Sequence, residues 1–137
     1  THITEALRTN MSGGKTVAQL LAEAGARVPF MSQPELADRI GANSRDLVIL
    51  DIREKDAFEA GHVPGAVHLP RGQLELRVNG ELPDPTVRIL TYCEFGKIST
   101  LAAATLRDLG YGRASALDGG MKAWRVAGYP VNSGAQA

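Results

Sequence analysis

Short apolar runs alternate with amphipathic stretches along most of the chain. The apolar runs are continuous, as is typical of strands buried on both faces of a sheet. We expect strands at residues 28–31, 47–50, 66–69, 87–92 and 114–117. Apolar residues at helical spacing predict helices at residues 33–40, 54–60, 73–78, 100–109 and 121–127. Strands joined by helical crossovers pair in parallel, so the pattern predicts an α/β fold, a three-layer α/β/α sandwich around a central parallel sheet.

Local signals mark several ends of these elements. Ser32 and Glu35 have the spacing of a capping box, and Pro34 suits the first turn of the helix that follows. Turn-forming residues predict turns at 64–65, 79–80 and 83–85.

A further amphipathic helix precedes this alternation, at residues 16–27. Its apolar residues recur at helical spacing: Val17, Leu20, Leu21 and Ala24. The helix either packs on its own domain or forms a contact in a homodimer. We expect residues 1–15 to be poorly structured, residues 28–131 to form the main domain and residues 132–137 to be a frayed tail.

Composition narrows the function classes. The 137 residues are 44% apolar and 22% charged, which suits one domain whose core needs neither disulfide nor metal. Basic and acidic residues number 15 each, which argues against nucleic-acid binding through a broad basic face. No apolar run reaches the ~20 residues of a membrane helix, and no signal-peptide pattern opens the sequence. We therefore expect no nucleic-acid partner, no membrane and a cytoplasmic location.

Cys93 is the only cysteine, which excludes an intrachain disulfide and a cysteine zinc cluster. The three histidines, His2, His62 and His68, are scattered, so no metal site is expected. His62 precedes a turn, where a hydrogen-bonding role is favoured over acid–base work.

Cys93 stands at the carboxyl end of the strand expected at 87–92, where ligands bind in such sheets. Gly96 and a helix start near Ser99 follow it. Backbone N–H groups in such a loop, together with the helix dipole, stabilise an anion and hence a thiolate. This context favours a reactive thiol over a buried filler. Glu94 opposes it, since a neighbouring carboxylate disfavours the thiolate.

Four motifs together resemble the rhodanese-like family of sulfurtransferases. They are Leu50-Asp51-Ile52-Arg53 with Phe58; Gly61-His62-Val63-Pro64-Gly65-Ala66 with His68-Leu69-Pro70; Tyr92-Cys93 with Gly96 and Ser99; and Leu117-Asp118-Gly119-Gly120 with Ala123-Trp124 and Gly128-Tyr129-Pro130-Val131. They follow the family's order and spacing from Met31 to Val131. The resemblance implies a rhodanese-like, single-domain sulfurtransferase.

The resemblance also implies a mechanism. The Cys93 thiolate would take the outer sulfur of thiosulfate or another persulfide or thiol donor, and would pass it to a thiol, a cyanide-like acceptor or a protein acceptor. The substrate-binding loop would hold the anionic persulfide: Glu94, Phe95, Gly96, Lys97, Ile98 and Ser99. Asp51 and Arg53 would brace this loop. Arg71 could face the same sheet edge and contact substrate or partner. No cofactor is implied.

The loop departs from the family pattern at two positions. Members specialised for thiosulfate commonly carry a cation two residues after the cysteine, which here is Phe95. Many single-domain members carry an arginine five residues after it, which here is Ile98. Lys97 is the only cation of the loop. We expect weak use of thiosulfate and a larger, more apolar or protein-bound donor or acceptor. Phe95 either contacts that partner or folds onto its own domain.

Three other interpretations compete with an active sulfurtransferase. The domain could be a sulfur carrier or interaction module that works only when docked on a partner, or an inactive domain. A phosphatase or arsenate reductase would need an arginine six residues after the cysteine, where this chain has Ser99. Structural roles are expected for Gly119 and Gly120, as positive-φ positions, and for Trp124, as a core residue.

Overall fold

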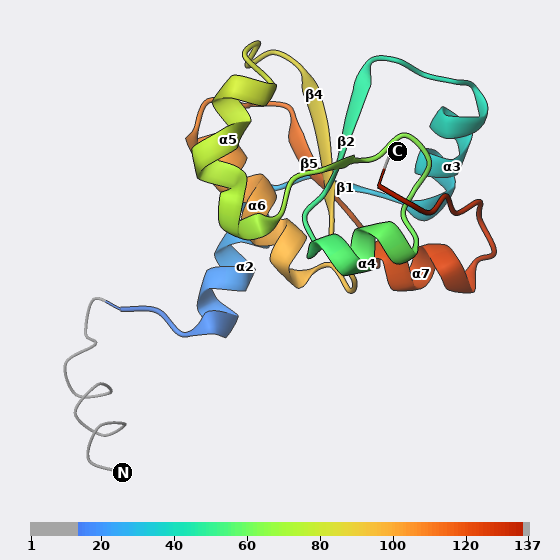
Figure 1. Cartoon of the computed structure of the whole chain (residues 1–137). Helices are drawn as coiled ribbons and strands as arrows, with labels where there is room; N and C mark the ends of the chain where they lie inside the picture. Colours follow the sequence, from blue (N-terminus) through green and yellow to red (C-terminus); the bar gives the residue numbers. More distant parts are fainter. Residues whose placement is uncertain (1–13, 136–137) are drawn as a thin grey trace.

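The computed structural model describes residues 14–135, so most of the segment expected to be poorly structured, residues 1–13, lies outside it. A five-stranded parallel sheet in the order β1-β5-β4-β2-β3 forms the centre of the molecule (Figure 1). The elements are α2 (Val17–Arg27), β1 (Phe30–Met31), α3 (Gln33–Gly41), β2 (Leu47–Asp51), α4 (Lys55–Ala60), β3 (Val67–His68), the 3-10 helix η1 (Arg71–Gln73), α5 (Leu74–Glu81), β4 (Arg88–Tyr92), α6 (Lys97–Asp108), β5 (Ala114–Leu117) and α7 (Gly120–Val126). The sheet with its helices confirms the α/β fold expected from the sequence.

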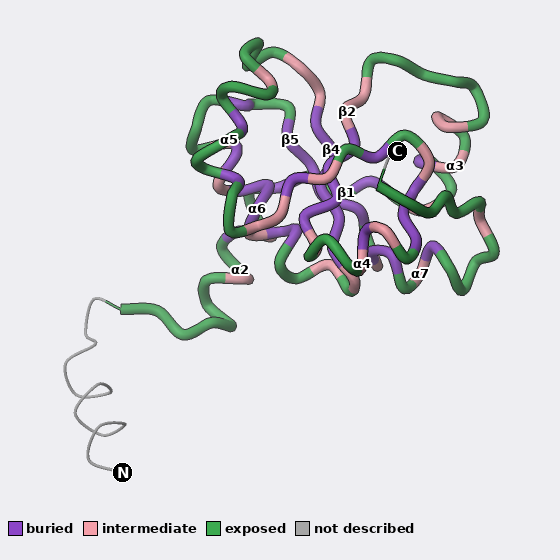
Figure 2. The backbone as a smooth tube through the Cα atoms, in the orientation of Figure 1, coloured by how far each residue is buried: buried purple, intermediate pink, exposed green. Residues whose placement is uncertain are grey.

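Two hydrophobic cores lie on opposite faces of the sheet. Buried residues of α2, α5 and α6 belong to one core. Buried residues of α3, α4 and α7 belong to the other, which contains Trp124. Figure 2 shows the buried backbone concentrated along the central strands. Because the strands are buried on both faces, their sequences are continuous apolar runs rather than alternating ones. Trp124 is fully buried, as expected.

The carboxyl ends of β2 and β4 lie side by side at one end of the sheet. Asp51 pairs with Tyr92 in the parallel register, so the residues that follow the two strands are neighbours. One half of the capping box predicted for α3 is present, since the Ser32 side chain accepts from the Glu35 N–H at 3.2 Å. The Glu35 carboxylate pairs with Arg39 instead of the Ser32 N–H. The capping residue Ser32 therefore predicted the start of α3 correctly.

Several element bounds differ from those expected. The turn predicted at residues 79–80 is wrong, because α5 continues to Glu81. The Tyr111 hydroxyl lies 3.1 Å from Asn79 Oδ1 and 2.6 Å from the Leu82 carbonyl, so a distant residue holds the end of this helix. The first and third strands are shorter than predicted. Helix α6 begins at Lys97, earlier than expected.

Helix α2 lies where the sequence predicts a helix, and it packs on α6. Ala24 is buried in the core beneath it, and Arg27 Nη2 donates to the Ala104 carbonyl at 3.0 Å. The tail expected from residue 132 onward is bonded to the domain at Asn132, which bridges His62, and at Gly134.

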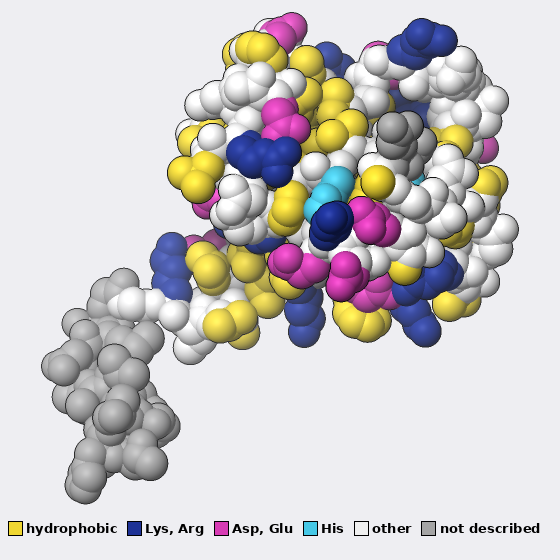
Figure 3. Space-filling model, in the orientation of Figure 1, with side chains coloured by type: hydrophobic (Ala, Val, Ile, Leu, Met, Phe, Trp, Pro, Cys, Tyr) yellow, Lys and Arg dark blue, Asp and Glu magenta, His cyan; other side chains and the backbone are white. Residues whose placement is uncertain are grey.

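Charged side chains of both signs lie on the surface of the molecule. Figure 3 shows basic and acidic side chains interspersed on the visible face. Within residues 14–135, no helix has the length and apolar character that crossing a membrane requires.

Candidate active site

Cys93 comes directly after β4 and is only 5% exposed. Its Sγ accepts hydrogen bonds from the backbone N–H of Gly96 at 3.1 Å and of Ser99 at 3.3 Å. The Ser99 Oγ lies 3.4 Å from the same sulfur. Because α6 begins at Lys97, the positive end of its dipole lies next to Sγ. The two backbone N–H groups and the helix dipole form an anion-binding cradle around the sulfur.

The loop of the cradle is shorter than the sequence indicated. Only Glu94, Phe95 and Gly96 lie between β4 and α6, apart from Cys93 itself, and Ser99 is already in the first turn of the helix. Gly96 has a φ of +112°, a left-handed conformation that favours glycine. This turn of the backbone aims the Gly96 N–H back at the sulfur.

The N-terminus of helix α7 holds the cysteine loop through backbone hydrogen bonds. The Met121 N–H donates to the Cys93 carbonyl and the Lys122 N–H donates to the Glu94 carbonyl, both at 2.9 Å. Gly120 has a φ of +62°, and a Cβ at this position would lie 2.6 Å from the Cys93 carbonyl oxygen. The positive φ expected for Gly119 and Gly120 is confirmed, and close backbone approach is the reason at Gly120.

Arg53 and Asp51 form a buried pair beside the loop. Arg53 Nη2 donates to Asp51 Oδ2 and to the Gly61 carbonyl, both at 2.7 Å. The Tyr92 hydroxyl also donates to Asp51 Oδ2, at 2.6 Å. Burial disfavours the charge of Arg53, but its hydrogen bonds and ion pair with Asp51 outweigh this and raise its pKa. Burial, followed by the negative charge of Asp51, raises the pKa of Tyr92 far above its ordinary value.

Glu94 is held by two guanidinium groups. Arg53 Nη1 lies 3.2 Å from its Oε1, and Arg125 of α7 binds its Oε2. The carboxylate is therefore compensated, whereas the sequence indicated one that simply opposes the thiolate. Arg125 was missed by sequence reasoning, because only the fold brings α7 against the loop.

A cavity of about 460 Å³ opens beside Cys93. Its walls include residues of the cysteine loop, of the first turn of α6, of the segment after β2 and of η1. They are Cys93, Glu94, Phe95, Lys97, Ile98, Ile52, Arg53, Glu54 and Arg71. Phe95 is 70% exposed and Ile98 is 52% exposed, so most of the Phe95 side chain is open to solvent. Arg71 lies in the cavity wall. The structure thus brings every loop residue except Gly96 and Ser99 to the cavity itself, while those two contact the sulfur.

Comparison with known proteins places the chain in a family. The model of the rhodanese-like domain matches residues 32–127. This chain belongs to the rhodanese-like domain family. The thiosulfate sulfurtransferase GlpE of Pseudomonas putida is 37% identical over 108 residues, which are 78% of this chain and 90% of the relative.

Two other relatives of this rhodanese-like chain carry different descriptions. The putative sulfur carrier protein YrkF of Bacillus subtilis is 30% identical over 75% of this chain, which spans only 54% of that relative. A protein of unknown function from Rhodopseudomonas palustris, described as a possible tyrosine phosphatase, has a TM-score of 0.79 and 30% identity; the match covers 86% of this chain and 95% of that one.

His62 packs inside this rhodanese-like domain. The buried His62 ring stacks on Phe58 with centroids 4.0 Å apart, and its Nδ1 lies 2.8 Å from the Phe58 carbonyl oxygen. Within the part of the chain that the structure describes, no three potential metal ligands gather.

Proposed function

We propose that this protein is a sulfurtransferase that carries sulfane sulfur as a persulfide on Cys93. The observation that carries the proposal is the pair of backbone N–H groups, from Gly96 and Ser99, within 3.3 Å of Sγ at the start of α6. Fixed N–H donors lower the energy of an anion without reorganising, and both the thiolate and the persulfide are anions. The near-complete burial of the sulfur limits its contact with water.

The reaction then has two displacements. The Cys93 thiolate attacks the outer sulfur of a donor such as thiosulfate, a Cys93–sulfur bond forms, the donor S–S bond breaks and sulfite leaves. An acceptor thiolate or cyanide next attacks the outer sulfur of the persulfide, and the Cys93 thiolate leaves. Asp51 and Arg53 brace the loop, since Arg53 connects β2, the Gly61 carbonyl and Glu94.

The cavity favours substrates larger than thiosulfate. Phe95 and Ile98 present apolar surface where a small dianion would need cations, and the 460 Å³ cavity far exceeds the few tens of Å³ of one such anion. We therefore expect thiosulfate to load the protein slowly and a larger organic or protein-bound donor or acceptor to react faster.

The test is the intact mass of the protein after incubation with thiosulfate and then with cyanide. We expect a gain of one sulfur atom that cyanide removes, and no gain in Cys93→Ser. An organic persulfide donor serves as the second donor, because thiosulfate use is expected to be weak. If neither donor adds sulfur to Cys93, the proposal is wrong.

A second candidate is a sulfur carrier that turns over only on a partner protein. The similarity to the putative sulfur carrier protein of Bacillus subtilis favours it. The carrier would form the persulfide but would not pass sulfur to cyanide or small thiols. A steady-state assay with these acceptors separates the two functions.

Phosphatase activity is disfavoured by the same loop. A phosphatase of the related loop fold needs a guanidinium six residues after the cysteine to clamp the oxyanion, and Ser99 stands there. Its hydroxyl lies against the sulfur and the Gly96 carbonyl. Phosphate-ester hydrolysis that depends on Cys93 would contradict this argument.

A further inference from the structure

We propose that the preferred sulfur acceptor is an organic thiol that carries an anionic group on an extended uncharged spacer, and that Arg71 binds this anion. The inference rests on the proposed function, since it names the substrate class of the same site. It follows from two cavities along α6, the first beside Cys93 and the second further along the helix, that share Arg71 as a wall.

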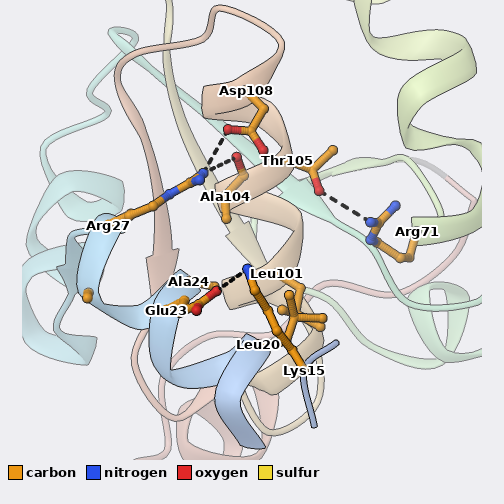
Figure 4. A pocket seen from close by; sticks show the side chains of 11 residues that line it. Lys15, Leu20, Glu23, Ala24, Arg27, Arg71, Leu101, Ala104, Thr105 and Asp108 are labelled. Carbon is orange, nitrogen blue, oxygen red and sulfur yellow. Dashed lines mark hydrogen bonds and ion pairs between the residues drawn. The ribbon is translucent and has the colours of Figure 1, made fainter. Parts of the chain in front are cut away.

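We call these two neighbouring cavities together the groove. One is the cavity of about 460 Å³ beside Cys93. The other, of about 600 Å³, lies between α2, α6 and η1, and Figure 4 shows it. One face of α6 lines both cavities, with Lys97 and Ile98 in the first, and Leu101, Ala104 and Thr105 in the second. Spacings of three and four residues put these side chains on the same side of the helix.

Arg71 is fixed at the junction of the two cavities. Its backbone N–H donates to the Ile52 carbonyl at 3.0 Å, beside the Cys93 cavity. Its Nη1 lies 2.8 Å from Glu75 Oε1, and its Nη2 donates to the Thr105 hydroxyl at 3.4 Å, as Figure 4 shows for the latter. The side chain is 32% exposed, and a guanidinium has five N–H donors, so donors are left for a ligand.

The positions of the sulfur and of Arg71 along α6 favour a ligand longer than thiosulfate. Ser99 touches the sulfur and Thr105 touches the guanidinium. These two residues are about 9 Å apart along the helix axis at a rise of 1.5 Å per residue. Thiosulfate is far shorter than this span. A ligand that reaches both points needs a spacer of several bonds between its sulfur and its anion.

The walls between these points suit such a spacer. Ile98 and Leu101 offer apolar contact along α6. The acidic Glu94 is neutralised by Arg53 and Arg125, which leaves Glu54 as the acidic wall residue without an ion pair among the residues that the structure describes. Arg71 and Lys97 supply the positive charge. A carboxylate of a peptide thiol or a phosphate of a pantetheine-type thiol would fit this chemistry equally.

The reaction balances without another reactant. The acceptor thiolate attacks the outer sulfur of the Cys93 persulfide, a bond forms between the acceptor sulfur and that sulfur, and the bond to Cys93 Sγ breaks. The electron pair of the broken bond stays on Cys93 as thiolate, and the proton of the acceptor thiol passes to solvent. No net oxidation or reduction of the protein occurs.

The experiment compares acceptors that differ only in the anion. Protein loaded with sulfur reacts with glutathione or its diethyl ester, and with 4′-phosphopantetheine or pantetheine, while mass spectrometry follows the loss of sulfur. Each pair isolates one anion source. We expect the anionic member of at least one pair to react about tenfold faster, the change that one charge-assisted hydrogen bond supplies.

Substitutions test whether Arg71 causes the preference for anionic acceptors. Arg71→Gln should remove the preference by slowing the anionic acceptor about tenfold while leaving the neutral one unchanged, and Arg71→Lys should retain part of it. Arg77→Gln is the matched control, because Arg77 forms the same 2.8 Å ion pair with a residue four positions on but lines neither cavity. Equal rates for the members of both pairs, or equal slowing of both members by Arg71→Gln, would overturn the inference.

A measurement without sulfur transfer separates this inference from the proposed function. S-methylglutathione cannot accept sulfur, but in the groove it would shield Cys93 from iodoacetamide. We expect protection in the wild type and in Arg77→Gln, weaker protection in Arg71→Gln and weaker protection by the diethyl ester. If S-methylglutathione protects Cys93 but Cys93 takes up no sulfur, the proposed function is refuted and the anion site is not. Absence of protection together with absence of acceptor preference refutes the anion site alone.

Discussion

Glu94 follows Cys93 directly, so the compensation of its carboxylate determines how much negative charge faces the sulfur. Two arginines from different elements, Arg53 after β2 and Arg125 in α7, compensate it. A partly exposed ion pair contributes little to stability, yet it changes the local electrostatic potential. The role of Arg125 is therefore better tested through the reactivity of Cys93 than through the free energy of unfolding.

Arg125→Gln should slow the alkylation of Cys93 by iodoacetamide at neutral pH and low salt. Glu94 would keep Arg53 as its remaining guanidinium partner, and its less compensated charge would slow the reaction by up to about fivefold, for a partly exposed pair worth at most about 1 kcal/mol. Glu94→Gln in the same chain should restore the rate. Lys122→Gln is the control, since it removes a cation of the same helix that does not bind the carboxylate through its side chain. An equally slow double variant would contradict the electrostatic explanation.

Tyr92 predicts how stability depends on alkaline pH. Burial and the charge of Asp51 raise the pKa of its hydroxyl, so the folded state keeps a proton that the unfolded state releases near pH 10. The unfolded state then binds fewer protons, and the free energy of unfolding falls as pH rises above about 10, by at most about 1.4 kcal/mol per pH unit.

Tyr92→Phe isolates this contribution. The variant loses the hydroxyl that donates to Asp51 and accepts from the Val63 N–H, at a cost of about 1–3 kcal/mol near neutral pH. The difference in unfolding free energy between wild type and variant should narrow above pH 10, as measured by urea denaturation at several pH values. A constant difference up to pH 11 would mean that Tyr92 titrates normally.

At the scale of elements, the N-terminus of α7 determines where the cysteine loop lies. Gly120→Ala would bring a Cβ to 2.6 Å from the Cys93 carbonyl oxygen at a φ of +62°. Gly128→Ala is the matched control, with a φ of +78° and no atom within 4 Å of the added Cβ. We expect about 1–2 kcal/mol of destabilisation for Gly128→Ala from strain alone, and about 3 kcal/mol or more for Gly120→Ala from strain and backbone contact.

Cys93 alkylation provides the second measurement for this pair of variants. Because Gly120→Ala must displace the Cys93 and Glu94 carbonyls, it should also change the rate at which Cys93 reacts, at a urea concentration where the protein remains folded. Gly128→Ala should leave that rate unchanged. Similar costs and similar reactivity in both variants would show that the close approach of the two segments does not matter.

The elements that the sequence predicts well are those whose signals are local. The continuous apolar run before Asp51 and the cap at Ser32 depend only on neighbouring residues, and both are where expected. The turn predicted at Asn79 failed because Tyr111, far along the chain, holds the helix end. Likewise, Cys93 could be found from its place after a strand, but Arg125 and the groove wall at Arg71 depend on how distant elements pack.

At the scale of the whole molecule, the sheet lies between two hydrophobic cores, and its strands contribute side chains to both. Leu106 of α6 lies in the core with α2 and α5, and Leu36 of α3 lies in the core with α4 and α7. Strand β4 supplies Ile89 to one core and Leu90 to the other. A strand shared in this way makes it costly for one layer to unfold while the other stays folded.

Trp124 allows this coupling to be measured, because it is the single tryptophan and is buried in the core opposite Leu106. Leu106→Ala should cost about 2–5 kcal/mol, as does truncation of a buried leucine in other cores. If the molecule unfolds as one unit, urea denaturation followed by Trp124 fluorescence shifts by the same amount as that followed by far-UV circular dichroism. Leu36→Ala, on the tryptophan side, should give the same coincidence. A fluorescence transition that stays in place in Leu106→Ala while the circular dichroism transition shifts would show that the two layers unfold independently, and that the α6 layer opens while the α7 support beneath Cys93 remains folded.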